Sequence, residues 1–390
     1  MKDPKRKAFG QEEHDMVQEC LAYYLNSNED FPYDGKYQKE FESMFSEKMG
    51  SGFSLATNSG SSAAYVALMG LELPRGSTVL MSPVTDTSSY MAIILAGLNP
   101  VIVDTQIDSY NACFDSFKRA YSIDVSAIYL VHSYGSPVDA ESVSDYCELN
   151  NIKLIEDCSQ SPFAKTEKGH IVGTIGDVGV FSTMYRKSVQ TCSSGGVVYT
   201  KNAELYEKLV EYSDRGRPKS STNYDFRQPG NCRVISHNFN TNELSCAIGI
   251  GSLKRISDTI KKRTDIVSKL SKNIVELTGG RCKPMKFVGH PSPFLLPIIL
   301  DGDSKLRDKL YSNLKQARIP FVERYNCYAY DWNIVRNTKR SIVANIARLP
   351  KKWVYDTNAR KLHANTCNIF INEAYTDEYI AFILDCFREF

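Results

Sequence analysis

The sequence predicts an α/β protein, with a mainly parallel seven-stranded sheet in a large domain and a smaller C-terminal α+β domain. Between residues 53 and 200, short apolar runs alternate with amphipathic stretches of helical period. This spacing is typical of parallel strands that are covered by helices on both faces. The chain has 390 residues, which is enough for one large core and a smaller appended unit.

Seven apolar runs are predicted to be the strands of this sheet: residues 53–57, 78–84, 100–104, 127–134, 153–157, 179–183 and 196–200. Helical patterns at residues 61–71 and 139–150 lie between some of them. Ligands of such sheets collect beyond the carboxyl ends of the strands. We therefore expect a site near Asp157 and near the loops that begin at Thr57 and Ser182.

A long helix is predicted to begin at Glu243, with Asn242 as its N-cap. Its apolar stripe has the spacing of a face that packs on a core: Leu244, Ile248, Leu253, Ile256, Ile260 and Leu270. Such a helix would carry the chain from the large domain into the smaller one. Residues 215–237 have no periodicity and contain two prolines, so they are predicted to form a long loop.

The composition argues against several classes of protein. Hydrophobic residues make up 42%, charged residues 24%, and the net charge is +2, so nothing favours nucleic acid or an anionic membrane as a partner. There is no run of about 18 apolar residues that would span a membrane. Polar residues follow the basic N-terminus, where a secretion signal would be apolar. The 11 cysteines are scattered without a CxxC pair, so we expect reduced thiols, a cytoplasmic location and no bound metal.

The segment 57–64, TNSGSSAA, follows an apolar run and opens a predicted helix. Gly60 allows a tight turn there, and exposed N–H groups at the start of a helix attract a phosphate group. The same pattern also fits an ordinary capped helix after a glycine turn.

Two side chains at strand ends indicate one kind of chemistry. Asp157 ends an apolar run, and Lys187 lies in the loop after another. Pyridoxal phosphate chemistry needs an acid that keeps the pyridine nitrogen protonated and a lysine that forms an imine. Each residue also has an ordinary interpretation, because a strand-end aspartate can cap a turn and a lysine beside Arg186 can be solvated. Their order, spacing and shared location at strand ends favour the cofactor site, with Gln160 and Ser182 as further contacts.

These motifs resemble those of the DegT/DnrJ/StrS sugar aminotransferases, which are pyridoxal-phosphate enzymes of fold type I, the aspartate aminotransferase fold. The resemblance extends over residues 41–256. NSGSSA at 58–63 resembles the family's SGT-A-A phosphate turn, and AGLNPVIVD at 96–104 resembles its AGA-PVFVD strand. IEDCSQ at 155–160 is similar to IEDCAQ, and GDVGVFS at 176–182 is similar to GDIG-FS.

The resemblance implies pyridoxal 5'-phosphate as the cofactor and Lys187, six residues after Phe181, as the catalytic Schiff-base lysine. It implies these cofactor-binding residues: Gly60, Ser61, Asp86, Asp157, Gln160, Ser182, Lys187 and Asn238. In the family, the residue at the position of Asn238 reaches the phosphate of the neighbouring subunit. A homodimer with shared active sites is therefore also implied.

The implied reaction moves an amino group from an amino acid, with glutamate the expected donor, to a keto sugar linked to a nucleotide. Such products serve surface polysaccharide or glycoside biosynthesis. Three alternatives stay open: a free keto sugar acid as the acceptor, a sugar 3-dehydratase on the same scaffold, and a regulatory protein without turnover. The dehydratases carry histidine in place of the lysine, so Lys187 argues against them.

The expected organisation has three parts. Residues 1–44 are predicted to form an N-terminal segment that joins the small domain. Residues 45–255 are predicted to form the large cofactor-binding domain, and residues 256–390 the small C-terminal domain.

Three positions depart from the family pattern. Asp86 stands where an aromatic ring usually stacks on the cofactor, and Tyr90 or Tyr185 are candidates to replace that ring. Asn240 stands where arginine is usual. SSGG at 193–196 replaces GEGG, with one extra residue after the lysine.

The region after residue 256 matches the family poorly. There, Tyr325, Trp332 and Arg324 are candidates either to contact the substrate or to pack the small domain.

Overall fold

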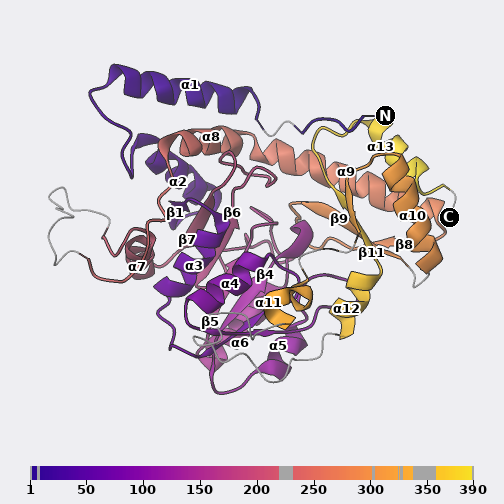
Figure 1. Ribbon diagram of the computed structural model, residues 1–390, viewed down its shortest axis with the longest axis horizontal. Helices are drawn as coiled ribbons and strands as arrows, with labels where there is room; N and C mark the ends of the chain where they lie inside the picture. The colour runs from indigo at the N-terminus through magenta and orange to yellow at the C-terminus, as the bar shows by residue number, and fades with distance from the viewer. Residues whose placement is uncertain are drawn as a thin grey trace.

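The fold is described from a computed structural model of the chain, for residues 2–6, 9–218, 232–300, 304–323, 325, 328–336 and 357–388. Its large sheet has seven strands in the order β1-β7-β6-β5-β4-β2-β3 (Figure 1). The strands are β1 (Phe53–Thr57), β2 (Thr78–Met81), β3 (Asn99–Ile102), β4 (Val125–Val131), β5 (Lys153–Asp157), β6 (Val178–Ser182) and β7 (Gly196–Thr200). β7 is antiparallel to both of its neighbours and the other pairs are parallel. The predicted mainly parallel sheet is confirmed.

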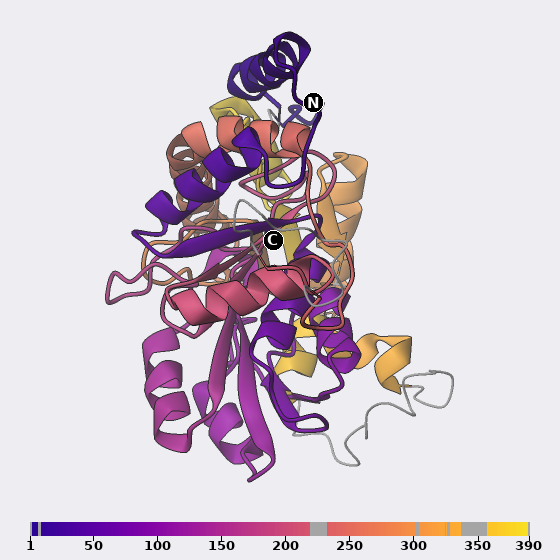
Figure 2. The same ribbon diagram turned by 90° about the vertical axis from the view of Figure 1, so that its left-hand side faces the viewer.

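Helices cover both faces of this sheet, as Figure 2 shows. They are α3 (Gly60–Gly70), α4 (Thr87–Leu95), α5 (Phe114–Ala120), α6 (Ala140–Asn150) and α7 (Ala203–Ser213). Successive residues of β4 face opposite ways, as strand geometry requires. Ala127 and Tyr129 belong to the core that contains α3 and α4, whereas Ile128 and Leu130 belong to the core that contains α5 and α6. Because both faces are buried, such strands read in the sequence as continuous apolar runs.

The C-terminal part contains a second, antiparallel sheet of four strands in the order β10-β11-β9-β8. Its strands are β8 (Cys282–Pro284), β9 (Leu295–Leu300), β10 (Phe321–Glu323) and β11 (Thr366–Phe370). The helices and short turns of this part are α9 (Ile256–Leu277), α10 (Ser304–Gln316), η3 (Ala329–Asp331), α11 (Asn333–Arg336), α12 (Thr357–Ala364) and α13 (Asp377–Asp385). Apolar residues of α9, α10 and α13 form one core with this sheet, including Leu270, Leu310 and Ile383. The predicted combination of a large α/β unit and a smaller α+β unit is confirmed.

The N-terminal segment contacts both parts of the molecule. α1 (Gln11–Asn26) and α2 (Lys36–Lys48) pack against α8 (Glu243–Lys254), and Figure 1 shows α1 lying along α8. Before α1, the chain runs toward α13, where the side chain of Asn372 donates a hydrogen bond to the carbonyl of Pro4. The expected domain boundaries at 44/45 and 255/256 remain proposals.

One predicted helix is corrected. The helix from Glu243 is divided into α8 and α9 at Arg255, whose φ of −106° and ψ of 3° interrupt the helical backbone. The bend brings the guanidinium of Arg255 to 2.6 Å from the buried carboxylate of Glu13 on α1. Asn242 caps α8 as predicted, because its side chain accepts the N–H of Ser245 at 2.9 Å.

Three predicted strands end at least two residues earlier than expected, and one of them, the run 100–104, stops at Ile102. The run 78–84 stops being a strand at Met81, because Pro83 has no N–H to offer a neighbouring strand. The run 127–134 ends at Val131 and continues as the short turn η1 (Ser133–Gly135), where Tyr134 has a φ of 48°. Of the predicted loop 215–237, residues 219–231 lie outside the described part of the chain.

Within the described ranges, no helix is both long enough and apolar enough to cross a membrane.

Candidate active site

A cavity of about 410 Å³ lies beyond the carboxyl ends of several strands of the large sheet. Most of the predicted site residues line it: Gly60, Ser61, Asp86, Asp157, Gln160, Ser182 and Lys187. Asn238 does not. The structure therefore brings together residues that are far apart in the sequence, and their individual roles remain predictions.

The turn between β1 and α3 has the form of an anion site. The hydroxyl of Ser59 caps α3 by accepting the N–H of Ser62 at 3.1 Å. The N–H groups of Gly60 and Ser61 have no acceptor within the described residues. A Cβ on Gly60 would lie 2.7 Å from the Cβ of Ser182, so glycine is needed where these two loops meet. Two such N–H groups at a helix start, with serine hydroxyls around them, fit a phosphate group.

Asp157 forms the polar floor of the cavity and is 7% exposed. Its described hydrogen-bond donors are all neutral: the hydroxyl of Ser89 at 3.1 Å, the hydroxyl of Tyr129 at 3.0 Å and the N–H of Ser159 at 3.0 Å. Burial and the nearby Asp157 raise the pKa of Tyr129 well above its ordinary value, so this phenol stays a neutral donor. A carboxylate held only by neutral groups fits a cationic ring N–H.

Lys187 is held in a turn after β6 and is 9% exposed. Its N–H donates to the carbonyl of Met184 at 2.9 Å. Its Nζ lies 4.6 Å from the centre of the Phe294 ring. The amine therefore faces the C-terminal wall of the cavity, which is formed by Phe294, Val322, Tyr325 and Phe370. A lysine that is sheltered from bulk water and shares a cavity with an anion turn and a carboxylate is the arrangement that pyridoxal phosphate requires.

The extra residue after the lysine does not move Lys187 out of the cavity. The loop closes where the hydroxyls of Thr183 and Thr191 lie 2.7 Å apart and the N–H of Thr191 donates to the carbonyl of Thr183 at 2.8 Å. Residues 192–194, which follow this closure, form an exposed turn. The additional length is therefore accommodated at the surface.

Gln160 links the large sheet to the C-terminal part. Its Oε1 accepts the N–H of Tyr134 at 2.7 Å, and its Nε2 donates to the hydroxyl of Tyr325. The Tyr325 ring stacks on Tyr110 with 5.5 Å between the ring centres. Tyr134 has a positive φ of 48°, a strained backbone conformation that is found at functional sites more often than elsewhere.

The aromatic ring missing at Asp86 is not supplied by the expected substitutes. Asp86 is exposed and caps α4 by accepting the N–H of Ser88 at 2.9 Å, a position that favours aspartate. Tyr90 is buried against Trp332, with 6.0 Å between the ring centres, and Tyr185 is exposed. Neither tyrosine lines the cavity. Its aromatic lining comes from Tyr129, Phe294, Tyr325 and Phe370.

The remaining C-terminal candidates, Tyr325, Trp332 and Arg324, differ in where they lie. Tyr325 lines the cavity, whereas Trp332 packs with the apolar core of the large sheet. Arg324 lies outside the described residues.

Asn238 lies on an exposed part of the chain, outside the cavity. Its Nδ2 donates to the hydroxyl of Tyr33 at 3.2 Å, and its Oδ1 accepts the N–H of Asn240 at 3.0 Å. Asn240, which replaces the usual arginine, therefore supports the side chain of Asn238.

One buried group of potential metal ligands occurs in the described part of the chain: His132, Glu156 and Cys158. Nδ1 of His132 accepts the N–H of Val138 at 3.0 Å, so its proton lies on Nε2, 3.1 Å from the Glu156 carboxylate. Glu156 also accepts N–H groups of the loop 173–176. Burial alone would raise the pKa of Glu156, but His132 and these N–H groups lower it. Hydrogen bonds within the protein thus account for these polar atoms.

The sequence did not predict Tyr129, Arg186, Phe294 and Phe370 as site residues, although all four line the cavity. A signal existed for Tyr129, a hydroxyl-bearing residue in an otherwise apolar run near a strand end. Phe294 and Phe370 adjoin the pairing of β9 with β11, in which Leu295 lies opposite Phe370. That pairing joins residues too far apart in the sequence for a local pattern to reveal it.

Comparisons with known proteins agree with this geometry. The model of the DegT/DnrJ/EryC1/StrS aminotransferase family matches residues 9–355, a longer range than the motifs at 41–256. The GDP-perosamine synthase of Escherichia coli O157:H7 is 27% identical over 308 residues, which are 79% of this chain and 80% of that protein.

Two solved structures share the fold. The aminotransferase from Psychrobacter cryohalolentis superposes with a TM-score of 0.85 at 23% identity, covering 98% of this chain and 97% of that one. A mutant of GDP-4-keto-6-deoxymannose-3-dehydratase (ColD), with bound GDP-perosamine, superposes with a TM-score of 0.82 at 23% identity, covering 98% and 99%. The expected enzyme class and its dependence on pyridoxal phosphate are confirmed, and the chain belongs to the DegT/DnrJ/EryC1/StrS aminotransferase family.

Proposed function

We propose that this enzyme transfers an amino group from glutamate to a keto sugar linked to a nucleotide. The observation that carries the proposal is that Asp157, Ser182 and Lys187 line one cavity. The name of the relative GDP-perosamine synthase indicates an amino sugar linked to a nucleotide. When bound, pyridoxal 5'-phosphate supplies an electron sink for breaking bonds at the carbon that carries nitrogen.

The residues of the large sheet have distinct roles in this proposal. The amine of Lys187 binds the cofactor covalently and then moves a proton at the reacting carbon. Asp157 keeps the pyridine nitrogen protonated, because its described donors are neutral and leave its charge available. Ser61, Ser182 and the N–H of Gly60 bind the phosphate.

The C-terminal wall is proposed to orient the ring and exclude water. Tyr325 holds the Nε2 side of Gln160, which we expect to contact the ring oxygen of the cofactor. Phe294 and Phe370 adjoin each other, with 6.5 Å between their ring centres. Excluding water strengthens each charge interaction in the cavity.

Arg186 is our candidate for the diphosphate of the nucleotide sugar. It is exposed, lines the cavity, and lies over two rings, with its guanidinium carbon 5.3 Å from the centre of Tyr185 and 5.7 Å from that of Phe370. A guanidinium binds phosphate oxygens in a fork of two parallel hydrogen bonds.

We also propose a homodimer in which Asn238 contacts the phosphate in the neighbouring site. The exposure of Asn238 outside its own cavity, beside the exposed ring of Tyr33, supports this arrangement. Mixing inactive Lys187→Ala and Asn238→Asp chains should restore about a quarter of the wild-type activity, because half of the randomly paired dimers would have one intact site. No recovery after dissociation and reassembly would contradict shared sites.

We further propose a cytoplasmic location, which the absence of disulfides among the described cysteines supports.

The test of the function is incubation with nitrogen-15 glutamate and GDP-4-keto-6-deoxymannose, followed by mass spectrometry of the sugar. A product that gains the labelled nitrogen is expected. A product that loses oxygen and gains no nitrogen would instead establish the dehydratase, the activity named for one neighbour of the same fold. Transfer to a free keto sugar acid only would contradict the nucleotide-linked acceptor, and no transfer to either acceptor would contradict the proposed function.

A further inference from the structure

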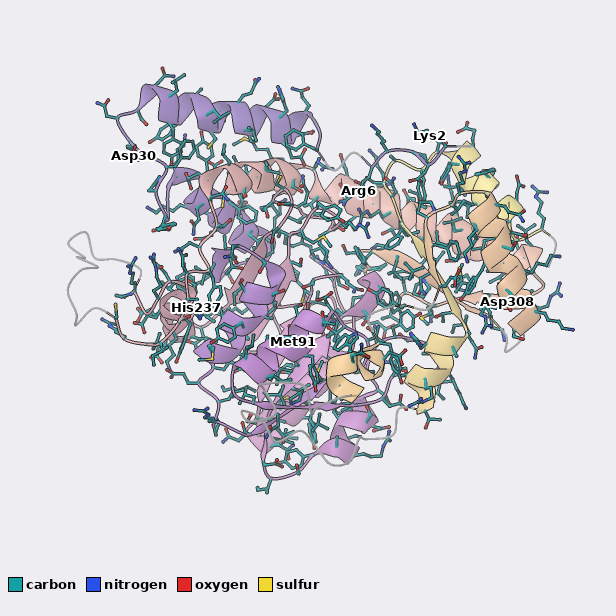
Figure 3. All side chains as sticks on the ribbon, viewed as in Figure 1. Lys2, Arg6, Asp30, Met91, His237 and Asp308 are labelled. Atoms are coloured by element: carbon teal, nitrogen blue, oxygen red, sulfur yellow. The ribbon has the colours of Figure 1, made fainter. Side chains whose placement is uncertain are left out.

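Three charged side chains form a cluster outside the cavity, and two of them contact the Lys187 loop. They are Arg6 of the N-terminal segment, Arg263 of α9 and Glu373 between β11 and α13, and we call them the ion triad. Their side chains are 17%, 1% and 6% exposed, respectively. Figure 3 shows that Arg6, from the segment before α1, lies beside α9.

Arg263 fixes the two segments that enclose the lysine amine. Its Nη1 donates to the hydroxyl of Ser188, next to Lys187, at 2.9 Å and to the carbonyl of Pro293, next to Phe294, at 3.3 Å. Because Nζ of Lys187 lies over the Phe294 ring, one guanidinium holds the backbone regions of both the amine and the ring beside it.

Arg6 fixes the loop on its other side. Its Nη1 donates to the carbonyl of Tyr185 at 2.7 Å, and its Nη2 donates to the carbonyl of Lys187 itself. Its Nε donates to Glu373 at 3.2 Å. A single planar guanidinium makes these contacts, and the point charge of a lysine cannot reproduce that fork.

Glu373 joins the two arginines. Its Oε2 accepts from Nε and Nη2 of Arg263 at 2.9 and 2.8 Å, and its Oε1 accepts from Arg6. Burial alone would raise the pKa of Glu373, but the two guanidiniums outweigh it and lower the pKa to about 2. The carboxylate is therefore charged at working pH and offsets the repulsion between two buried cations.

We propose that Arg6, Arg263 and Glu373 are positioning residues for Lys187, which hold its loop so that the amine stays in the cavity beside Asp157. The inference rests on the proposed role of Lys187. Arg6 contacts the backbone of the lysine loop, Arg263 contacts the hydroxyl of Ser188, and none of the three triad residues lines the cavity. Loosening the triad should therefore slow the chemical steps while leaving substrate affinity nearly unchanged.

The variants that test this leave the core pair of Arg263 and Glu373 in place. Arg6→Met removes the hydrogen bonds to the loop. Arg6→Lys keeps the positive charge but lacks the planar guanidinium fork that donates to two loop carbonyls. Lys5→Met is the control for the loss of one positive charge from the same segment, because Lys5 is exposed and precedes Arg6. Arg255→Met is the matched control for loss of a buried ion pair, because Arg255 pairs with the buried carboxylate of Glu13 at 2.6 Å.

The first measurement is amide hydrogen exchange of the cofactor-free chain, which does not depend on any catalytic assignment. Peptides covering 183–191 should exchange about tenfold faster in Arg6→Met and in Arg6→Lys than in wild type, because local opening is no longer opposed by the fork. The same peptides should keep the wild-type rate in both control variants.

The second measurement separates kcat from KM in the cofactor-loaded enzyme. Arg6→Met should lower kcat by about tenfold to hundredfold, the scale that a displacement of about 1 Å imposes on a reacting group, with KM for either substrate changed less than about twofold. Loop exchange equal to that of Lys5→Met, or an equal kcat loss in Arg255→Met, would overturn the proposal. If the wild type transfers no nitrogen at all, the proposed function fails, while the exchange result still decides whether the triad holds the loop.

Discussion

The two walls of the cavity come from parts of the molecule that contribute different chemistry. The large sheet supplies the charged and hydroxyl groups, including Asp157, Ser182 and Lys187. The C-terminal part supplies rings, Phe294 and Phe370 among them. In the proposed mechanism, the groups that make and break bonds therefore belong to the large-sheet wall. The C-terminal wall is proposed to orient these groups and to exclude water.

The largest effect should come from the charge on the large-sheet wall. Asp157→Asn keeps the shape of the side chain but removes the charge that would hold a ring proton, and we expect kcat to fall by about 10² to 10³. Kinetics with saturating cofactor measures this. Asp139→Asn is the matched control, because Asp139 is not part of the cavity lining and caps α6 by accepting the N–H of Ser142 at 3.1 Å, a role that asparagine also fulfils. An equal loss in both variants would contradict the division of roles.

The ion triad should make the free energy of unfolding depend on pH in the acid range, through Glu373 of the C-terminal part. The folded pKa of Glu373 is about 2 against an ordinary 4.5, so between these values the folded chain binds fewer protons than the unfolded chain. Its stabilisation is therefore fully present above the ordinary value and is lost as the pH falls toward the folded one, by an amount on the order of 3 kcal/mol.

Urea unfolding of wild type and Glu373→Gln, from about pH 6 down to about pH 3, measures this contribution. The free energy of unfolding of the wild type should fall more steeply with acid than that of the variant. Parallel curves for the two proteins would mean that the Glu373 carboxylate is not stabilised in the fold.

A smaller effect is expected at the mouth of the cavity. Arg186→Met should raise KM for the nucleotide sugar about tenfold, through loss of a charge-assisted contact with phosphate, and leave KM for glutamate within about twofold. Steady-state kinetics with each substrate varied in turn measures both constants. A rise confined to glutamate would assign Arg186 to the amino donor instead.

The smallest effect should come from the link between the walls. Tyr325→Phe removes the hydroxyl that accepts from Gln160 but keeps the ring that stacks on Tyr110. The loss of one hydrogen bond of about 1 kcal/mol should lower kcat/KM several-fold. If Tyr325→Phe lowers kcat/KM as much as Asp157→Asn does, the C-terminal wall takes part in the chemistry. That result would contradict the proposed division of roles between the two walls.

The large sheet was predictable because its signals are local. An apolar run that stops at Asp157 indicates one strand end, and the glycine turn at Gly60 indicates another, each within a few residues of sequence. The parallel architecture then brings these strand ends together. The strand boundaries that were wrong, near Pro83 and Tyr134, depend on backbone geometry that an apolar pattern does not record.

The C-terminal wall was not predictable for the opposite reason. The Phe294 ring reaches Phe370 because β9 pairs with β11. The contact of Arg6 with Tyr185 in the lysine loop joins residues that are 179 positions apart in the sequence. At the break between α8 and α9, Arg255 likewise contacts Glu13, a residue of another helix. Such long-range contacts leave no periodic signal in either segment.

The central claim is that Lys187 is the residue that binds pyridoxal 5'-phosphate covalently. Borohydride reduction of the cofactor-loaded protein, followed by proteolysis and mass spectrometry, tests it directly. The account predicts one modified peptide, with the added mass on Lys187, and no modification in Lys187→Ala. Label on another lysine, or on none, would contradict it.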